Sequence, residues 1–268
     1  MSELLALARQ PHAAEAPFRL AAPNVTDCHL AAAGRDTRGS AVAALGVRRV
    51  VRHGPPRATA TPSPRASRHD APAVRYVIDA LPPDAPSLLD LHLRGARGIR
   101  HTLAVDAASR AAQLAVISRD ADAIAPFGWH IELAVGADLA VLAGCEWELL
   151  QLPVALCLAD VTDAVTRLGV RDDSVAMLLD LLHMGRTYIQ LDGELRYAEL
   201  RGFVNAALAV RADRLTWGSG APAPHARPAD HARVVAARLA VLERLIPDED
   251  DRAAVLVENP ARLYGFEG

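Results

Sequence analysis

Short runs of apolar residues recur along the chain and alternate with segments that have helical spacing. Their lengths and their branched and aromatic side chains are typical of buried parallel strands. Eight runs are predicted as strands: Ala22–Cys28, Gly46–Val51, Val74–Asp79, Gly98–Leu103, Gly128–Leu133, Pro153–Leu158, Thr187–Leu191 and Arg214–Gly218.

Three of the intervening segments show clear helical patterns. Ser87–Leu93 opens with a residue suited to a helix N-cap, and apolar positions at helical spacing recur over Val175–Leu182 and Val234–Leu245. Strands alternating with helices over about 250 residues predict an α/β fold of the (β/α)₈ TIM-barrel type, somewhat distorted. An open doubly wound sheet would need a Gly-rich phosphate turn after the first strand, and the residues after Asp27 do not form one.

The chain is expected to hold one domain. Residues 1–21 are predicted to be a loose N-terminal extension, and residues 22–268 a single barrel domain. Residues 53–72 contain five prolines and no periodicity, which indicates an excursion from the barrel.

The amino-acid composition excludes several kinds of catalytic chemistry and partner. Apolar residues make up 51% of the 268 residues, which excludes global disorder. All 29 basic residues are arginine, so imine-forming lysine, a pyridoxal phosphate linkage and a P-loop lysine are excluded. A net charge of −3 gives no reason to expect a nucleic acid or an anionic membrane as partner.

The three cysteines, Cys28, Cys145 and Cys157, form neither a disulfide framework nor a zinc motif. Together with the absence of a signal-peptide pattern and of a long apolar run, they predict a cytoplasmic protein that does not span a membrane.

Four segments resemble, in their order, the amidohydrolase superfamily, and specifically the branch that contains 2-pyrone-4,6-dicarboxylate lactonases. They are Val25–His29, Leu91–Arg100, Trp217–Ser219 and Glu258–Phe266. The resemblance implies a distorted TIM barrel, a site at the carboxyl ends of the strands, and hydrolysis of a small carboxylated metabolite at a lactone or related bond.

The catalytic motifs of that branch are incomplete. On the first predicted strand, Ala31 replaces the second histidine of Asp-x-His-x-His, and on the sixth, Cys157 and Leu158 replace an Asp-His pair. On the seventh strand, Gln190 and Asp192 stand where lysine and serine are frequent. After the Trp-Gly-Ser of the eighth strand, Gly220 and Ala223 replace an aspartate and a histidine. In the family that aspartate deprotonates the attacking water and ligates metal where metal is present. We therefore expect no family-type metal centre and no cofactor.

The remaining polar residues give a candidate site. Its catalytic members are Asp27, His29 and Asp192, with the Asp27 carboxylate orienting the His29 imidazole, since both lie on one face of a regular strand. The substrate-binding candidates are Arg100, His130, Glu132 and Ser219.

Two of these residues have a second interpretation. Arg100 either binds a substrate carboxylate or forms a structural ion pair, and His130 either binds substrate or completes a strand end. Strand alternation places Arg100 with Thr102 and His130 with Glu132, so that not all three candidates can point inward.

Two functions remain open at this stage. One is a hydrolase of the lactonase type that acts on a small anionic metabolite, with Asp192 or Glu132 standing in for the lost aspartate. The other is a catalytically inactive relative that serves as a binding or scaffold protein. The Ala- and Leu-rich helical faces are compatible with a homodimer.

Overall fold

A computed structural model describes residues 24–31, 42–43, 45–56, 72–81, 85–136, 138–220 and 228–267. The predicted extension over residues 1–21 lies outside the described residues, as do residues 57–71 of the proline-rich segment.

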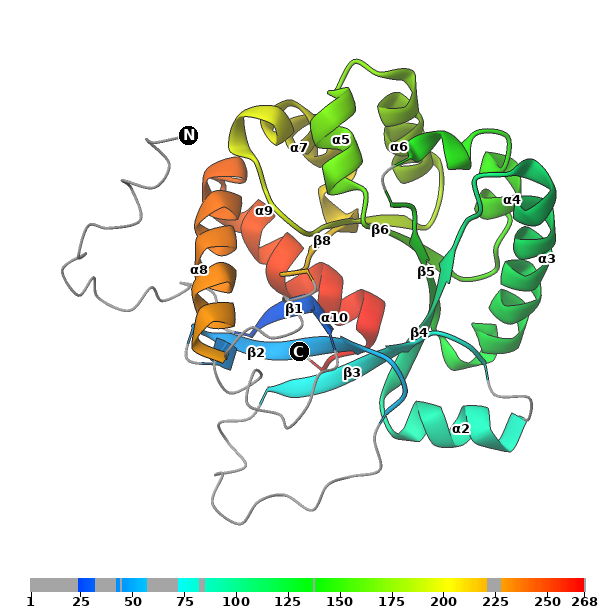
Figure 1. Cartoon of the computed structure of the whole chain (residues 1–268). Coiled ribbons are helices and arrows are strands. Elements are labelled where there is room, and N and C mark those ends of the chain that lie inside the picture. Colours follow the sequence, from blue (N-terminus) through cyan, green and yellow to red (C-terminus); the bar gives the residue numbers. More distant parts are fainter. Residues whose placement is uncertain are drawn as a thin grey trace, which may run out of the picture.

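The strands form one parallel sheet in which neighbours follow the order of the chain, as a TIM barrel requires (Figure 1). The predicted fold class is confirmed. The strands are β1 (Val25–Ala31), β2 (Val47–His53), β3 (Ala73–Ile78), β4 (Ala96–Thr102), β5 (His130–Ala134), β6 (Ala155–Ala159), β7 (Thr187–Leu191) and β8 (Leu215–Trp217).

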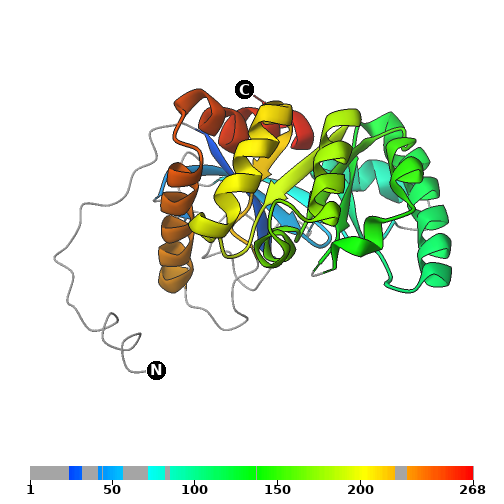
Figure 2. The ribbon, with the colours of Figure 1, turned by 90° about the horizontal axis from the view of Figure 1, so that it is seen from above.

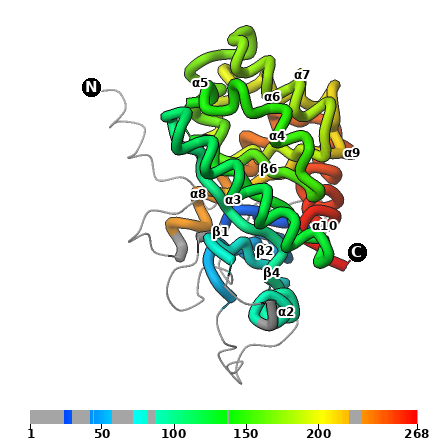
Figure 3. The backbone as a smooth tube through the Cα atoms, turned by 90° about the vertical axis from the view of Figure 1, so that its right-hand side faces the viewer, coloured from blue at the N-terminus to red at the C-terminus, as the bar shows by residue number. Residues whose placement is uncertain are grey.

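Helices follow the strands and cover the outside of the sheet, with α8 and α3 at opposite sides of the molecule (Figure 2). Helix α2 stands apart from the others (Figure 3). The α-helices are α2 (Ala85–Leu93), α3 (Ala107–Ile124), α4 (Glu146–Leu150), α5 (Thr162–Leu168), α6 (Asp173–Met184), α7 (Tyr197–Arg211), α8 (Pro228–Leu245), α9 (Glu249–Ala253) and α10 (Asn259–Tyr264). The three helical patterns predicted from the sequence lie in α2, α6 and α8. Within the described ranges, no helix has the length and apolarity needed to cross a membrane.

The end of the barrel opposite the predicted site is closed by the C-terminal segment. Helix α10 lies across this end (Figure 1), and the ring of Tyr264 packs with Cys28 and Cys157 in the barrel interior. The guanidinium groups of Arg49 and Arg75 lie 5.4 and 5.0 Å from the centre of the Phe266 ring. The C-terminal segment therefore closes the end of the barrel opposite the carboxyl ends of the strands.

A β-bulge interrupts β1 just before its end. Asp27 pairs with Val50 and Leu30 with Arg52, so β1 uses three residues where β2 uses two. As a result Cys28 contacts the interior cluster around Tyr264, and the ring of the next residue, His29, also faces residues of the interior. Regular alternation would have put these two neighbours on opposite faces.

Candidate active site

A buried histidine and a buried aspartate face each other at the carboxyl ends of β1 and β7. Nδ1 of His29 lies 3.9 Å from Oδ2 of Asp192 and 3.5 Å from the amide nitrogen of Gln190. Burial lowers the pKa of His29, but the nearby carboxylate of Asp192, helped by the charge of Glu132, outweighs it and raises the pKa above its usual value. The pair therefore favours a histidine that accepts and holds a proton.

Asp192 is fixed by three donors. Its Oδ2 accepts the backbone N–H of Asp160 at 2.9 Å and the side-chain amide of Gln190 at 3.3 Å, while Oδ1 accepts the Thr162 hydroxyl at 3.3 Å. The Thr162 hydroxyl oxygen in turn accepts the backbone N–H of Asp192 at 3.1 Å. These bonds hold the carboxylate in place beside the imidazole, which is the arrangement that a general base requires.

A second set of charges continues from this pair. The His29 and His53 rings lie 4.2 Å apart, and Nε2 of His53 is 3.4 Å from Oε1 of Glu132. The same Glu132 oxygen pairs with the Arg100 guanidinium, whose other arm pairs with Asp160. Since the backbone N–H of Asp160 bonds to Asp192, the contacts close a ring, which we call the mouth network: His29, His53, Arg100, Glu132, Asp160 and Asp192.

Burial raises the pKa of Glu132, but the charges of His53, Arg100 and His130 lower it to about 2. Glu132 is therefore ionised at any physiological pH. Its second oxygen is buried without a hydrogen-bond partner among the described residues.

Besides His53, the mouth network contains one residue that was not among the predicted site residues, Asp160. It directly follows β6 and has a left-handed backbone, with φ of 59°. Burial, and then the charge of Asp192, raise its pKa. Its place as the first residue after a buried strand was the available signal, but the comparison with the family's Asp-His pair directed attention to Cys157 and Leu158 instead.

Arg100 is already paired on both arms, so the ion-pair interpretation describes the structure as it stands. The prediction that Arg100, His130 and Glu132 cannot all point inward is wrong. Arg100 pairs in register with Glu132, and Gly98 with His130, so all three side chains are on the interior face.

His130 lies one layer below Glu132 and does not reach the mouth network through any hydrogen bond. Its ring packs edge-on against Tyr264, 4.9 Å between centres, beside Gly98, where a Cβ would come within 2.6 Å of the ring. Burial lowers the pKa of His130 to about 4, and the charge of Glu132 and the backbone of Arg97 oppose this only in part.

Asp27 and Ser219 lie at the join between β1 and β8. Oδ1 of Asp27 accepts the backbone N–H of Ser219 at 2.8 Å and that of His29 at 3.1 Å. This corrects the interpretation that Asp27 holds the His29 ring, because the carboxylate beside the ring is Asp192. Asp27 instead links two strands that approach closely at Gly218, where a Cβ would come within 2.7 Å of His29. The catalytic role predicted for Asp27 and the substrate contact predicted for Ser219 stay predictions.

The family's metal ligands do not fit this mouth. Leu158 is a fully buried apolar side chain, and Gly220 has no side chain and a φ of 72°. A Cβ at Gly220 would lie 3.1 Å from the Arg238 guanidinium and 3.2 Å from the backbone of Gly193. The backbone conformation and close neighbours therefore disfavour a side chain at the position that carries aspartate in the family, and we derive no step through a family-type metal.

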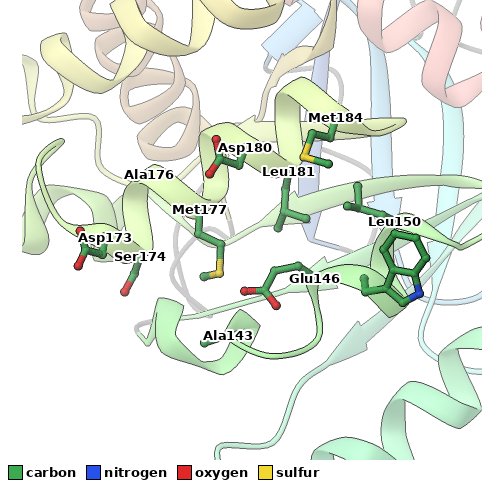
Figure 4. A pocket seen from close by; sticks show the side chains of 11 residues that line it. Ala143, Glu146, Leu150, Asp173, Ser174, Ala176, Met177, Asp180, Leu181 and Met184 are labelled. Atoms are coloured by element: carbon green, nitrogen blue, oxygen red, sulfur yellow. The ribbon is translucent and has the colours of Figure 1, made fainter.

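A separate groove of about 650 Å³ lies on the outside of the barrel, between α4 and α6 (Figure 4). Trp147, Met177 and Met184 line it, and none of its lining residues belongs to the mouth network. It is a surface feature distinct from the candidate site.

Comparisons with known proteins agree with this architecture. Over 192 residues the chain is 28% identical to the 4-sulfomuconolactone hydrolase of Rhizobium radiobacter, a match that covers 66% of this chain and 61% of that protein, less than two thirds of its length.

Crystal structures show the same fold at low identity. One is a protein of Agrobacterium tumefaciens (TM-score 0.68, 17% identity, 92% of this chain and 97% of that one). Another, from Pseudomonas putida, is assigned as a 2-pyrone-4,6-dicarboxylic acid hydrolase (TM-score 0.66, 19% identity, 91% and 98%).

The sequence model of one enzyme family extends over most of the chain. It matches residues 40–266, which include every strand from β2 to β8 and the C-terminal helix that closes the barrel. The barrel, the site at its carboxyl ends and this match agree: the chain belongs to the amidohydrolase family.

Proposed function

We propose that this protein is a hydrolase that opens a lactone, or cleaves a related ester bond, in a small carboxylated metabolite. The observation that carries the proposal is the buried His29–Asp192 pair at the carboxyl ends of the strands. The names of the similar proteins, a sulfomuconolactone hydrolase and a pyrone dicarboxylic acid hydrolase, support a lactone with acidic substituents as the substrate class.

The reaction follows from the chemistry of the pair. His29 takes a proton from water, and the hydroxide adds to the lactone carbonyl carbon. The tetrahedral adduct then breaks its bond to the ring oxygen, and the leaving oxygen takes the proton back from the imidazolium. Asp192 stabilises the imidazolium in between, which is the state that its charge favours by raising the pKa of His29. Water is consumed and a hydroxy acid, or its keto tautomer, is released.

Arg100 is the residue we assign to the substrate carboxylate. Of its two partners, Glu132 is fully buried, whereas the Asp160 side chain is 38% exposed. A substrate carboxylate therefore exchanges with Asp160, and Glu132 keeps the guanidinium in place.

The test is a panel of lactones, with and without carboxylate groups, hydrolysed by the wild type and by His29→Gln. We expect turnover of carboxylated lactones by the wild type and a loss of about 10² to 10⁴ in the variant. Arg100→Lys should raise KM for the carboxylated lactones and leave KM for neutral ones unchanged, because it keeps the charge and loses the planar fork. Wild-type protein that hydrolyses no member of the panel would overturn the proposal.

A second candidate function is that of a catalytically inactive binding protein, and the observation that favours it is the state of Gly220. Its positive φ and its close contacts disfavour the family's aspartate at this position. In that case lactones would raise the melting temperature of the protein without being hydrolysed, and Gly220→Asp would create no activity.

A further inference from the structure

We propose that His29, Asp160 and Asp192 form a binding site for one divalent first-row cation such as Mn²⁺ or Zn²⁺. The three residues come from β1, from the end of β6 and from the end of β7. Each offers one ligand atom, an imidazole nitrogen or a carboxylate oxygen, and these atoms all lie within 4.8 Å of one another. Only His29 is shared with the ligand positions of the family, so this is a different donor set.

The charges of the mouth network favour a cation. Three carboxylates, Glu132, Asp160 and Asp192, face a single guanidinium, that of Arg100. Two negative charges remain when both imidazoles are neutral, and a divalent ion balances them. The ion binds the neutral form of His29, so it competes with the proton that His29 accepts in the proposed hydrolysis. Glu132 is fully buried, and one of its oxygens has no hydrogen-bond partner in the part of the chain that the structure describes. Glu132 already has Arg100 and His53 as partners, so Asp160 and Asp192 hold the negative charge that an ion would balance.

The donor side chains are held by hydrogen bonds, as they are in known metal sites. Carboxylates that bind metals are themselves held by hydrogen bonds, and Asp192 receives such bonds from Thr162, Gln190 and the Asp160 backbone. The Asp160 backbone is held in the left-handed region, at φ of 59°, where that bond is made. Arg100 binds Asp160 through one carboxylate oxygen, Oδ2, and a carboxylate has a second oxygen that can bind an ion.

The types of donor atom also narrow the choice of metal ion. One imidazole with two carboxylates suits Zn²⁺ and Mn²⁺ better than Mg²⁺, which prefers oxygen ligands and retains water. Donor atoms around tetrahedral zinc lie about 3.4 Å apart. The donor atoms now lie within 4.8 Å of one another, with His29 and Asp192 at 3.9 Å, so all three side chains must draw closer when the ion binds.

Binding is tested on the full chain without substrate. Protein treated with a chelator and dialysed is titrated with Mn²⁺, followed by electron paramagnetic resonance, and with Zn²⁺, followed by calorimetry. We expect one equivalent to bind and the melting temperature to rise. Asp160→Asn and Asp192→Asn should each weaken binding by at least about 100-fold, since each removes a ligand and not only an outer partner. Asp163→Asn is the matched control, an exposed aspartate on the neighbouring helix α5, and should bind as the wild type does.

Circular dichroism establishes that each variant is folded. Asp160→Asn is the safer of the two, because the side chain is partly exposed at a strand end. Absence of stoichiometric binding in the wild type overturns the proposal, and so does binding that persists in both variants, because it would place the ion elsewhere. These measurements use no substrate, so their failure is separate from a failure of the proposed hydrolysis.

Discussion

Two buried histidines, one at the mouth of the barrel and one a layer below it, have opposite surroundings. His29 lies beside a carboxylate that is itself fixed by three donors, and its pKa is raised. His130 packs between Tyr264 and Gly98, neither of its ring nitrogens makes a well-aligned hydrogen bond within the described ranges, and its pKa falls to about 4. Burial pushes both rings toward the neutral form, so the difference comes from the partner.

The different surroundings of His29 and His130 indicate that the upper and lower layers of the barrel interior have different roles. The upper layer holds charged side chains in pairs, and it is the layer to which the proposed proton transfer and ion binding belong. In the lower layer the neutral His130 ring packs against Tyr264, which in turn packs with Cys28 and Cys157. The thiol pKa values of Cys28 and Cys157 are raised well above the usual value, first by burial, so neither thiol is a nucleophile at neutral pH.

The largest effect should follow from removing the partner that distinguishes His29. Asp192→Asn keeps the shape and the hydrogen-bonding capacity at the Thr162 side but removes the charge that stabilises the imidazolium. We expect kcat/KM on a carboxylated lactone to fall by about 10² to 10⁴. Asp163→Asn is the control and should leave kcat/KM unchanged. A variant at Asp192 with wild-type activity would mean that the paired histidine is not the base.

The layers of the barrel were predictable from the sequence to different degrees. The pattern of apolar residues along the chain reflects which side of each element is buried, and it predicted all eight strands and the three clearest helices. What they do not report is the register between strands. Pairing of Gly98 with His130 and of Arg100 with Glu132 puts all of these on one face, which alternation within single strands could not reveal.

The site was predicted only in part for the same reason. Of the predicted site residues, His29, Asp192, Arg100 and Glu132 meet at the strand ends, and their roles stay predictions. Their connections depend on the bulge in β1, which turns His29 away from Asp27 and toward Asp192. One extra residue in a strand leaves no mark on a hydrophobic pattern, so the pairing of Asp27 with the ring was an error that only the structure could correct.

A smaller effect is expected when the lower histidine is titrated. Its folded pKa of about 4 lies below the value of about 6.5 in the unfolded chain, so the stability it contributes is complete above pH 6.5 and is lost as the pH falls toward 4. That shift corresponds to roughly 3 kcal/mol of unfolding free energy. In His130→Leu, an apolar replacement of similar volume, we expect the loss between pH 6.5 and 4 to shrink by this amount, as measured by urea unfolding.

The control for this titration is His183→Gln, at an exposed histidine on α6. It should leave the pH dependence of the wild type unchanged. If the unfolding free energy of His130→Leu falls with pH as steeply as that of the wild type, protonation of His130 is not the cause of the acid sensitivity.

The next largest effect is expected where the His130 ring packs on Gly98 of β4. A Cβ at Gly98 would lie 2.6 Å from Cε1 and 2.8 Å from Nε2 of His130, so Gly98→Ala should reduce the unfolding free energy by about 1–3 kcal/mol. The same substitution in a His130→Ala background should cost far less, because the ring is gone. A double-mutant cycle measured by denaturant unfolding gives the coupling, and additive effects would contradict the contact.

The smallest effect is expected at Asp27, and it bears on the carboxylate that the sequence favoured as the partner of His29. Asp27→Asn keeps a carbonyl oxygen that can accept the N–H groups of His29 and Ser219, so the link between β1 and β8 survives. We expect kcat/KM to change by less than about tenfold, far below the loss at Asp192, because the charge that raises the pKa of His29 comes mainly from Asp192. Steady-state kinetics of both variants on the same lactone make the comparison direct. A loss at Asp27 as large as that at Asp192 would restore Asp27 to the catalytic group and show that the join between the strands takes part in the chemistry.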